Sequence, residues 1–174
     1  MKRITSALTV GLLAIAMVAA TASPVSAGNQ AERPYKGQEQ VFLSLDPSCD
    51  FTGPCGFTTD SAGTSSHLGK TTGTSTGIVS LTGPCTLLDG VTPGAAFSTS
   101  GEYIITAANG DTLSGIFENS GCAGLAPGTE MIPGGIAGTQ TIIGGTGRFE
   151  GASGSTVTFG DGIGPLHWVG TLTY

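Results

Sequence analysis

The feature that most restricts the fold of this chain is a glycine-rich segment at positions 144–154, with the sequence GGTGRFEGASG. Glycine has no Cβ atom and adopts backbone conformations with positive φ that other residues avoid. One large apolar side chain, Phe149, lies in the middle of the segment, and stretches typical of β-strands flank it at 139–143 and 155–159. The pattern predicts a compact turn between two antiparallel strands. Phe149 would point inward as a plug, and three glycines would shape the backbone around it: Gly144, Gly145 and Gly147.

Alternation of apolar and polar residues predicts further strands along the chain. The clearest alternation runs from 38 to 46, and others are expected at 75–82, 95–108, 111–118 and 166–174. The segments between them carry Gly, Pro and Cys, and they are expected to be loops or breaks at 47–63, 83–85 and 120–133.

Asn109-Gly110 is the strongest hairpin signal in the chain, because a type I′ turn needs positive φ at both central residues. A two-residue turn there places Tyr103 opposite Ile116 and Glu102 opposite Phe117. In that register Glu102 and Glu118 fall on different faces of the sheet. They would then not form the converging pair of carboxyl groups that a glycosidase requires.

The pattern as a whole predicts an all-β domain. No part of the mature chain shows a sustained apolar period of 3.6 residues, and many short Thr-rich strands with glycine turns are typical of a β-sandwich or a closed antiparallel barrel. A closed barrel has no exposed edge strands, which favours it for strands of this composition.

The N-terminal segment has the form of a bacterial signal peptide. Lys2 and Arg3 precede an apolar run at 7–20, and a small-residue cleavage site ends at Ala27. We therefore expect a signal peptide at 1–27, a flexible leader at 28–37 and one barrel domain at 38–174. The protein would be secreted or periplasmic, with no membrane span after cleavage.

The charge of the chain bears on its partners. The full chain has a net charge of −6, and removal of Lys2 and Arg3 with the signal peptide leaves −8. Binding to phosphates needs clustered Lys and Arg, so nucleic acid is not an expected partner.

The cysteines point to disulfide bonds. Four cysteines in an exported chain allow three pairings. We favour Cys49–Cys55, which closes a short loop, and Cys85–Cys122, which links two loops beside the central hairpin. No metal site is expected, because the chain has no C-x-x-C pair and its two histidines have no ligand spacing.

Three motifs carry a resemblance to a known family. The turn at 144–154 resembles the Gly-Gly-Thr-Gly-x-Phe turn of the allene oxide cyclase and dirigent protein superfamily. His67-Leu68-Gly69 and Ala108-Asn109-Gly110-Asp111 are similar to segments of bacterial secreted relatives of that barrel, so the likeness covers about 64–174. The resemblance implies a closed antiparallel barrel of about eight strands, with an apolar lumen and a tendency to form homo-oligomers. With the disulfides expected from the cysteines, the predicted fold is a disulfide-stabilised all-β barrel. None of the cyclase's catalytic residues can be matched to positions here.

The interior of such a barrel is the expected ligand site. Barrels of about eight strands are either filled by side chains or hold one small ligand, and the strands of this chain carry too much Gly and Ala for complete filling. The apolar faces of the last two strands, with Val157 and Phe159 on one and Trp168 on the other, are predicted to point inward. The candidate ligand contacts are Trp168, Phe159 and Tyr103.

The sequence offers little catalytic chemistry. His67 is a weak candidate for a general base, and a structural hydrogen bond to a neighbouring strand is the alternative. His167 is expected on the outer face. No nucleophile elbow, phosphate loop or cofactor motif is visible. Two functions follow: a secreted barrel module that binds a small apolar ligand, or a small isomerase or cyclase that holds an apolar substrate in its lumen.

Overall fold

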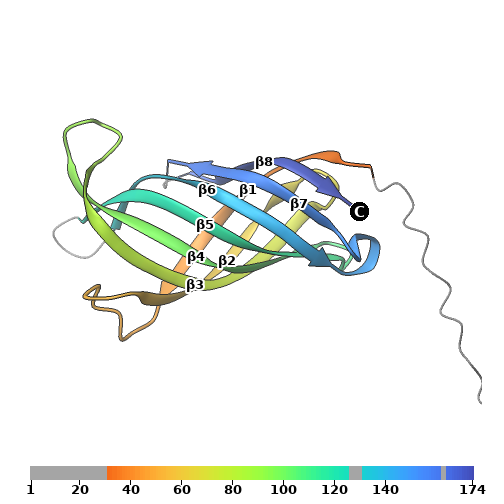
Figure 1. The fold of residues 1–174 in the computed structure, drawn as a ribbon, viewed down its shortest axis with the longest axis horizontal. Coiled ribbons are helices and arrows are strands. Elements are labelled where there is room, and N and C mark those ends of the chain that lie inside the picture. Colours follow the sequence, from red (N-terminus) through yellow and green to blue (C-terminus); the bar gives the residue numbers. More distant parts are fainter. Residues whose placement is uncertain (1–30, 126–130, 162–163) are drawn as a thin grey trace, which may run out of the picture.

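The structure is a computed structural model that describes residues 31–125, 131–161 and 164–174. Within these ranges the chain forms eight antiparallel strands in sequence order, and β8 pairs with β1 to close the sheet into a barrel (Figure 1). The expected signal peptide lies outside the described residues. The elements are β1 (Arg33–Leu45), β2 (Cys55–Ser65), β3 (Gly69–Thr86), β4 (Pro93–Ala107), β5 (Thr112–Leu125), β6 (Met131–Gly145), the 3-10 turn η1 (Gly147–Phe149), β7 (Ser153–Gly160) and β8 (Leu166–Thr173).

The barrel has two different ends. At one, which we call the closed end, β1 begins, β8 ends, and short turns join β2 to β3, β4 to β5 and β6 to β7. At the other, the open end, the connections 46–54 and 87–92 project beyond the strands, on the left in Figure 1. No helix among the described residues is long and apolar enough to cross a membrane.

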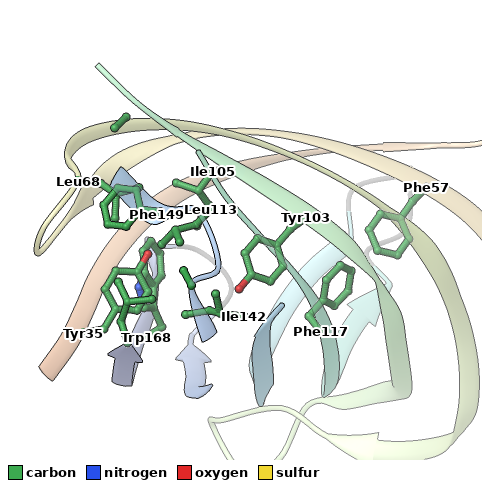
Figure 2. Close-up of a cluster of buried hydrophobic side chains, with 13 residues drawn as sticks. Tyr35, Phe57, Leu68, Tyr103, Ile105, Leu113, Phe117, Ile142, Phe149 and Trp168 are labelled. Carbon is green, nitrogen blue, oxygen red and sulfur yellow. The ribbon is translucent and has the colours of Figure 1, made fainter. Parts of the chain in front are cut away.

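The hydrophobic core lies at the closed end. Figure 2 shows Tyr35, Trp168 and Phe149 grouped there, and Phe57 and Phe117 farther along the barrel beyond Tyr103. Tyr35 and Trp168 are each 1% exposed, and their ring centroids lie 6.2 Å apart. The large side chains therefore fill one half of the barrel interior.

Phe149 closes this core, as the sequence predicts. It is fully buried, and its ring meets the ring of Tyr174 edge-on at 4.8 Å. Gly147 has φ +62°, and a Cβ there would collide with the carboxylate of Asp111. A Cβ at Gly145 would come within 2.9 Å of Phe149, whereas one at Gly144 would make only an ordinary contact. The structure thus explains two of the three glycines singled out in this turn.

The register of the central hairpin differs from the prediction by one residue. Gly110 has φ +89°, but Asn109 does not have positive φ, so the turn is not of type I′. The N–H of Gly110 donates to the carbonyl of Ala107, and the N–H of Ala107 donates to that of Asp111. This is a type I turn followed by a left-handed glycine, which adds one residue to the loop.

The longer loop changes which residues face each other. Tyr103 lies opposite Gly115 rather than Ile116, and Glu102 lies opposite Ile116 rather than Phe117. Glu102 and Glu118 are consequently both exposed on the outer face, not on different faces. They still do not converge on the barrel interior.

Several strands are longer than the alternation predicts. β1 begins at Arg33, so part of the expected leader, 33–37, is strand. β2 was not predicted: it lies within the expected loop at 47–63 and in the two residues after it. Its sequence is dominated by Thr, Ser and Gly and therefore shows no apolar alternation. The expected break at 83–85 is a bulge between Leu81 and Gly83, after which β3 continues to Thr86.

Both favoured disulfide pairings are confirmed, and both lie toward the open end. Cys49–Cys55 joins the β1–β2 connection to the start of β2. Cys85–Cys122 links β3 to β5 across β4, with a Cα–Cα distance of 6.0 Å. The bridges fit a protein of an oxidising compartment, outside the cell or in the periplasm.

Candidate functional site: the barrel cavity

A cavity of about 670 Å³ occupies the half of the barrel interior toward the open end. Its wall is mainly apolar. The apolar side chains that line it come from seven strands and include Val41, Leu45, Phe57, Val79, Phe97, Phe117, Ile136 and Leu166. This volume lies within the range of about 300–1,000 Å³ that is typical of small-molecule sites. The expected incomplete filling of the lumen is therefore confirmed.

The cavity exists because the inward positions toward the open end carry small or medium side chains. On β4, for example, the small side chains of Ala95 and Thr99 line the cavity beside Phe97, whereas Tyr103 and Ile105 fill the interior nearer the closed end. Side chains alternate between the two faces of a strand, so one strand builds both the cavity wall and the core beneath it.

Polar groups gather at the floor of the cavity, where it meets the closed-end core. Glu39 is the lining residue of β1 nearest the closed end, and Ser61 holds the same position on β2. The Ser61 hydroxyl donates a hydrogen bond of 2.7 Å to Oε2 of Glu39. Tyr103 and Gln140 line the same region from β4 and β6, and Gln140 accepts a hydrogen bond from Thr156 at 3.2 Å.

The protonation of these floor groups is shifted by their surroundings. Burial in the apolar interior raises the pKa of Glu39, and the hydrogen bond from Ser61 offsets only part of that rise. Burial also raises the pKa of Tyr103, and electrostatic repulsion between its ionised form and the ionisable groups of Tyr35 and Glu39 contributes further. Tyr35, in the core just below, has its pKa raised to about 12, mainly by burial. Both tyrosines are therefore neutral hydroxyls at physiological pH.

The structure places the three predicted ligand contacts in three different environments. Tyr103 lines the cavity. Trp168 faces the barrel interior but is buried in the closed-end core, away from the cavity wall. The prediction that Phe159 points inward is wrong: it is 48% exposed, and Val157 beside it is 54% exposed.

The inward positions of β7 belong instead to Thr156 and Thr158, which are 3% and 0% exposed. Thr158 pairs with Trp168 and Thr156 with Gly170. The indole of Trp168 already fills the interior beside this strand, so only small side chains fit at the positions next to it. Apolarity was therefore a poor guide to the inner face of β7.

Neither histidine lies in the cavity. His67 is in the β2–β3 turn at the closed end, where its Nε2 lies 2.9 Å from the carbonyl oxygen of Pro34 on β1. This is the structural hydrogen bond to a neighbouring strand that the sequence offered as the alternative to a catalytic role. His167 is on the outer face as expected, and its ring stacks on that of Phe159 at 5.6 Å.

Sequence reasoning missed Glu39, Ser61 and Gln140, although a signal for Glu39 was present. Glu39 continues the inward series of Val41, Leu43 and Leu45 by one step of two residues toward the N-terminus. The strand predicted at 38–46 already contains Glu39, and its alternation places the carboxyl group on the same face as Val41. Ser61 had no comparable signal, because β2 was not predicted. Gln140 shares the inner face of β6 with Ile142, but a polar residue there does not by itself indicate a cavity.

Glu39 should make stability depend on pH in a characteristic way. A carboxyl group whose pKa is raised by folding binds its proton more tightly in the folded state, so its contribution to stability falls as pH rises above the ordinary value of 4.5. We expect Glu39→Gln to be more stable than the wild-type protein at pH 7, and the difference to vanish near pH 4. Urea unfolding of both proteins at several pH values measures it.

The comparison between the two proteins isolates Glu39, because the loop aspartates titrate identically in both. Hydrogen bonds from neighbouring Ser and Thr residues lower the pKa of Asp46, Asp50 and Asp89. Protonation of these aspartates at acid pH therefore destabilises the folded state of both proteins to the same extent. A wild-type protein that is as stable as Glu39→Gln at pH 7 would contradict the prediction.

Neither a search of the described residues for metal sites nor comparison with known proteins identifies a second candidate site. Among the described residues, no group of three His, Cys, Asp or Glu side chains is placed to hold a metal ion. Searches against protein-family models, curated proteins and solved structures find no match to this chain.

Proposed function

We propose that the barrel binds one small, mainly apolar molecule in its lumen. The observation that carries the proposal is the cavity of about 670 Å³, walled by apolar side chains and reached from the open end. Leu43 and Leu81 line it and remain 46% and 45% exposed, so apolar surface continues to its mouth. Water molecules in such a cavity find few hydrogen-bond partners on its apolar wall. An apolar ligand that displaces them would be stabilised by burial of its surface.

The test is binding of a neutral dye, N-phenyl-1-naphthylamine, whose emission rises in apolar surroundings. We expect saturable binding to the wild-type protein at one dye per chain. Val79 and Thr99 form a cross-strand pair that faces the cavity, and the double variant Val79→Trp/Thr99→Trp should fill part of it and weaken dye binding by about tenfold or more.

The chain offers a matched control on the same two strands. Ile78 and Ser100 form the adjacent cross-strand pair on the outer face, so Ile78→Trp/Ser100→Trp adds the same side chains outside the barrel. This variant should bind dye as the wild type does. Equal weakening in both variants, or no saturable binding to the wild type, would reject the proposal.

A second function is favoured by one observation, the carboxyl of Glu39 and the hydroxyl of Tyr103 lining one apolar cavity. Two polar groups that face a common ligand site are the minimum for proton-transfer chemistry on an apolar substrate, such as isomerisation or cyclisation. We therefore also consider a place in the allene oxide cyclase and dirigent superfamily, which the turn at 144–154 resembles and with which an eight-stranded closed barrel agrees.

Proton transfer by Glu39 has a simple assay. The carboxylate would take a proton from the carbon beside the carbonyl group of a bound ketone, and in D₂O it would return a deuteron to the same carbon. Exchange into 2-undecanone, followed by NMR, should be faster with the wild-type protein than with Glu39→Gln. Equal rates with both proteins would leave ligand binding as the function.

A further inference from the structure

The Lys and Arg residues of the described chain are confined to one end of the barrel. All four of its Lys and Arg residues lie at the closed end: Arg33 and Lys36 in the first residues of β1, Lys70 at the start of β3, and Arg148 in η1. Arg148 is already paired with Asp111 at 3.2 Å. No Lys or Arg side chain therefore lies at the open end or in the cavity within the described residues, and His167 near the start of β8 is on the outer face.

The open end is acidic. Asp46 and Asp50 lie in the β1–β2 connection, Asp89 in the β3–β4 connection and Asp161 in the β7–β8 connection, and all four are exposed. Asp50 also lines the cavity. A ligand that enters the lumen must pass this set of carboxylates, which attracts cations and repels anions over a distance of about one Debye length, roughly 8–10 Å.

The floor of the cavity has the same preference. Within the described residues Glu39 receives one hydrogen bond, from Ser61, and no cation pairs with its carboxyl group. The other titratable groups that interact with it, Tyr35 and Tyr103, are neutral below the pKa of tyrosine and bring no positive charge. Oδ1 of Asn119, a further lining residue, is a buried acceptor without a partner in the described structure.

From these observations we infer that the ligand of the lumen is an apolar cation, such as an amphiphilic amine, whose ammonium group binds at Glu39 while its apolar body fills the cavity. The inference rests on the proposed function and names its ligand class. A half-buried carboxyl group on an apolar wall without a cationic partner is costly to ionise, and an ammonium group that enters with the ligand supplies that partner. A charge-assisted hydrogen bond to the carboxylate would then fix the orientation of the ligand.

Three ligands that share one alkyl chain and differ in the head group separate this inference from ligand binding in general. Decylammonium, 1-decanol and decanoate would each be titrated against bound N-phenyl-1-naphthylamine at neutral pH. We expect decylammonium to displace the dye at a concentration about tenfold or more below that of 1-decanol, and decanoate to be the weakest of the three.

Two matched variants show whether Glu39 is the cause. Glu39→Gln should bring decylammonium to within about threefold of 1-decanol while leaving 1-decanol unchanged. Glu118→Gln removes the same charge from the exposed outer face and should keep the wild-type order.

The possible results have distinct meanings. If the dye and 1-decanol bind but decylammonium binds no better, or if Glu39→Gln keeps the preference for the amine, the cation inference is overturned and the lumen remains a general apolar site. If neither the dye nor any of the three decyl ligands binds, the proposed function fails, and the inference fails with it.

Discussion

Replacement of Phe149 with alanine is expected to lower the free energy of unfolding by about 3–5 kcal/mol, the usual cost of truncating a buried aromatic side chain. Phe149 is fully buried and belongs to the core that contains Tyr35, Trp168 and Leu172. Its removal would leave a void at the point where the η1 turn covers the closed end. The tight backbone of the turn at Gly145 and Gly147 restricts how far the segment can collapse into that void.

Phe159→Ala provides the control for this prediction. It removes the same side chain from the outer face of the neighbouring β7, where Phe159 is 48% exposed and contacts His167. The expected loss there is about 1 kcal/mol or less. Urea unfolding of the two variants and the wild type measures both values, and losses of similar size would mean that Phe149 does not carry the closed-end core.

Local features of the sequence predicted the features of the fold that depend on local chemistry. The glycine turn around Phe149, the hairpin at Asn109-Gly110 and the two disulfide pairings all rest on residues with unusual conformational or chemical properties. Each of them lies where it was expected. The hairpin register was wrong by one residue because Asn109 lacks the positive φ that a two-residue turn would require.

Faces and boundaries were harder to predict because they depend on what fills the interior elsewhere. Thr158 is inside and Phe159 outside because Trp168, from the adjacent strand, already occupies the space. β2 was missed because its inward side faces a cavity and a polar floor, so Thr59 and Ser61 stand where a packed core would require apolar residues. The polarity that hid β2 from sequence analysis is the same polarity that equips the cavity floor.

This relation explains why Glu39 was the main omission. A carboxyl group on the inner face of a strand opposes stability, and no rule for building a core would place it there. Groups that oppose stability in a cavity are candidates for function, since binding or chemistry is what compensates for their cost. Glu39 interrupts the apolar inner face of β1, and this interruption makes it the main functional candidate of the cavity.

Removal of the Cys85–Cys122 bridge is expected to lower the free energy of unfolding by about 3–4 kcal/mol, because the intact bridge closes a long loop in the unfolded chain and so reduces its entropy. The two cysteines are 37 residues apart in sequence, whereas Cys49 and Cys55 are 6 apart. The double variant Cys85→Ala/Cys122→Ala should therefore lose more stability than Cys49→Ala/Cys55→Ala, for which the same relation gives about 2 kcal/mol. Urea unfolding of the two variants measures the difference.

The same pair of variants links stability to the cavity. Cys85–Cys122 ties the ends of β3 and β5 on either side of β4, whose residues Ala95, Phe97 and Thr99 line the cavity wall. Without this bridge the wall is expected to open more readily, so the affinity for N-phenyl-1-naphthylamine should fall under conditions in which the protein is still fully folded. Loss of the short bridge alters only the β1–β2 connection and should change dye affinity less. Equal losses of stability in the two variants would show that loop length does not determine how much each bridge contributes. Unchanged dye affinity without Cys85–Cys122 would show that strand pairing alone holds the cavity wall.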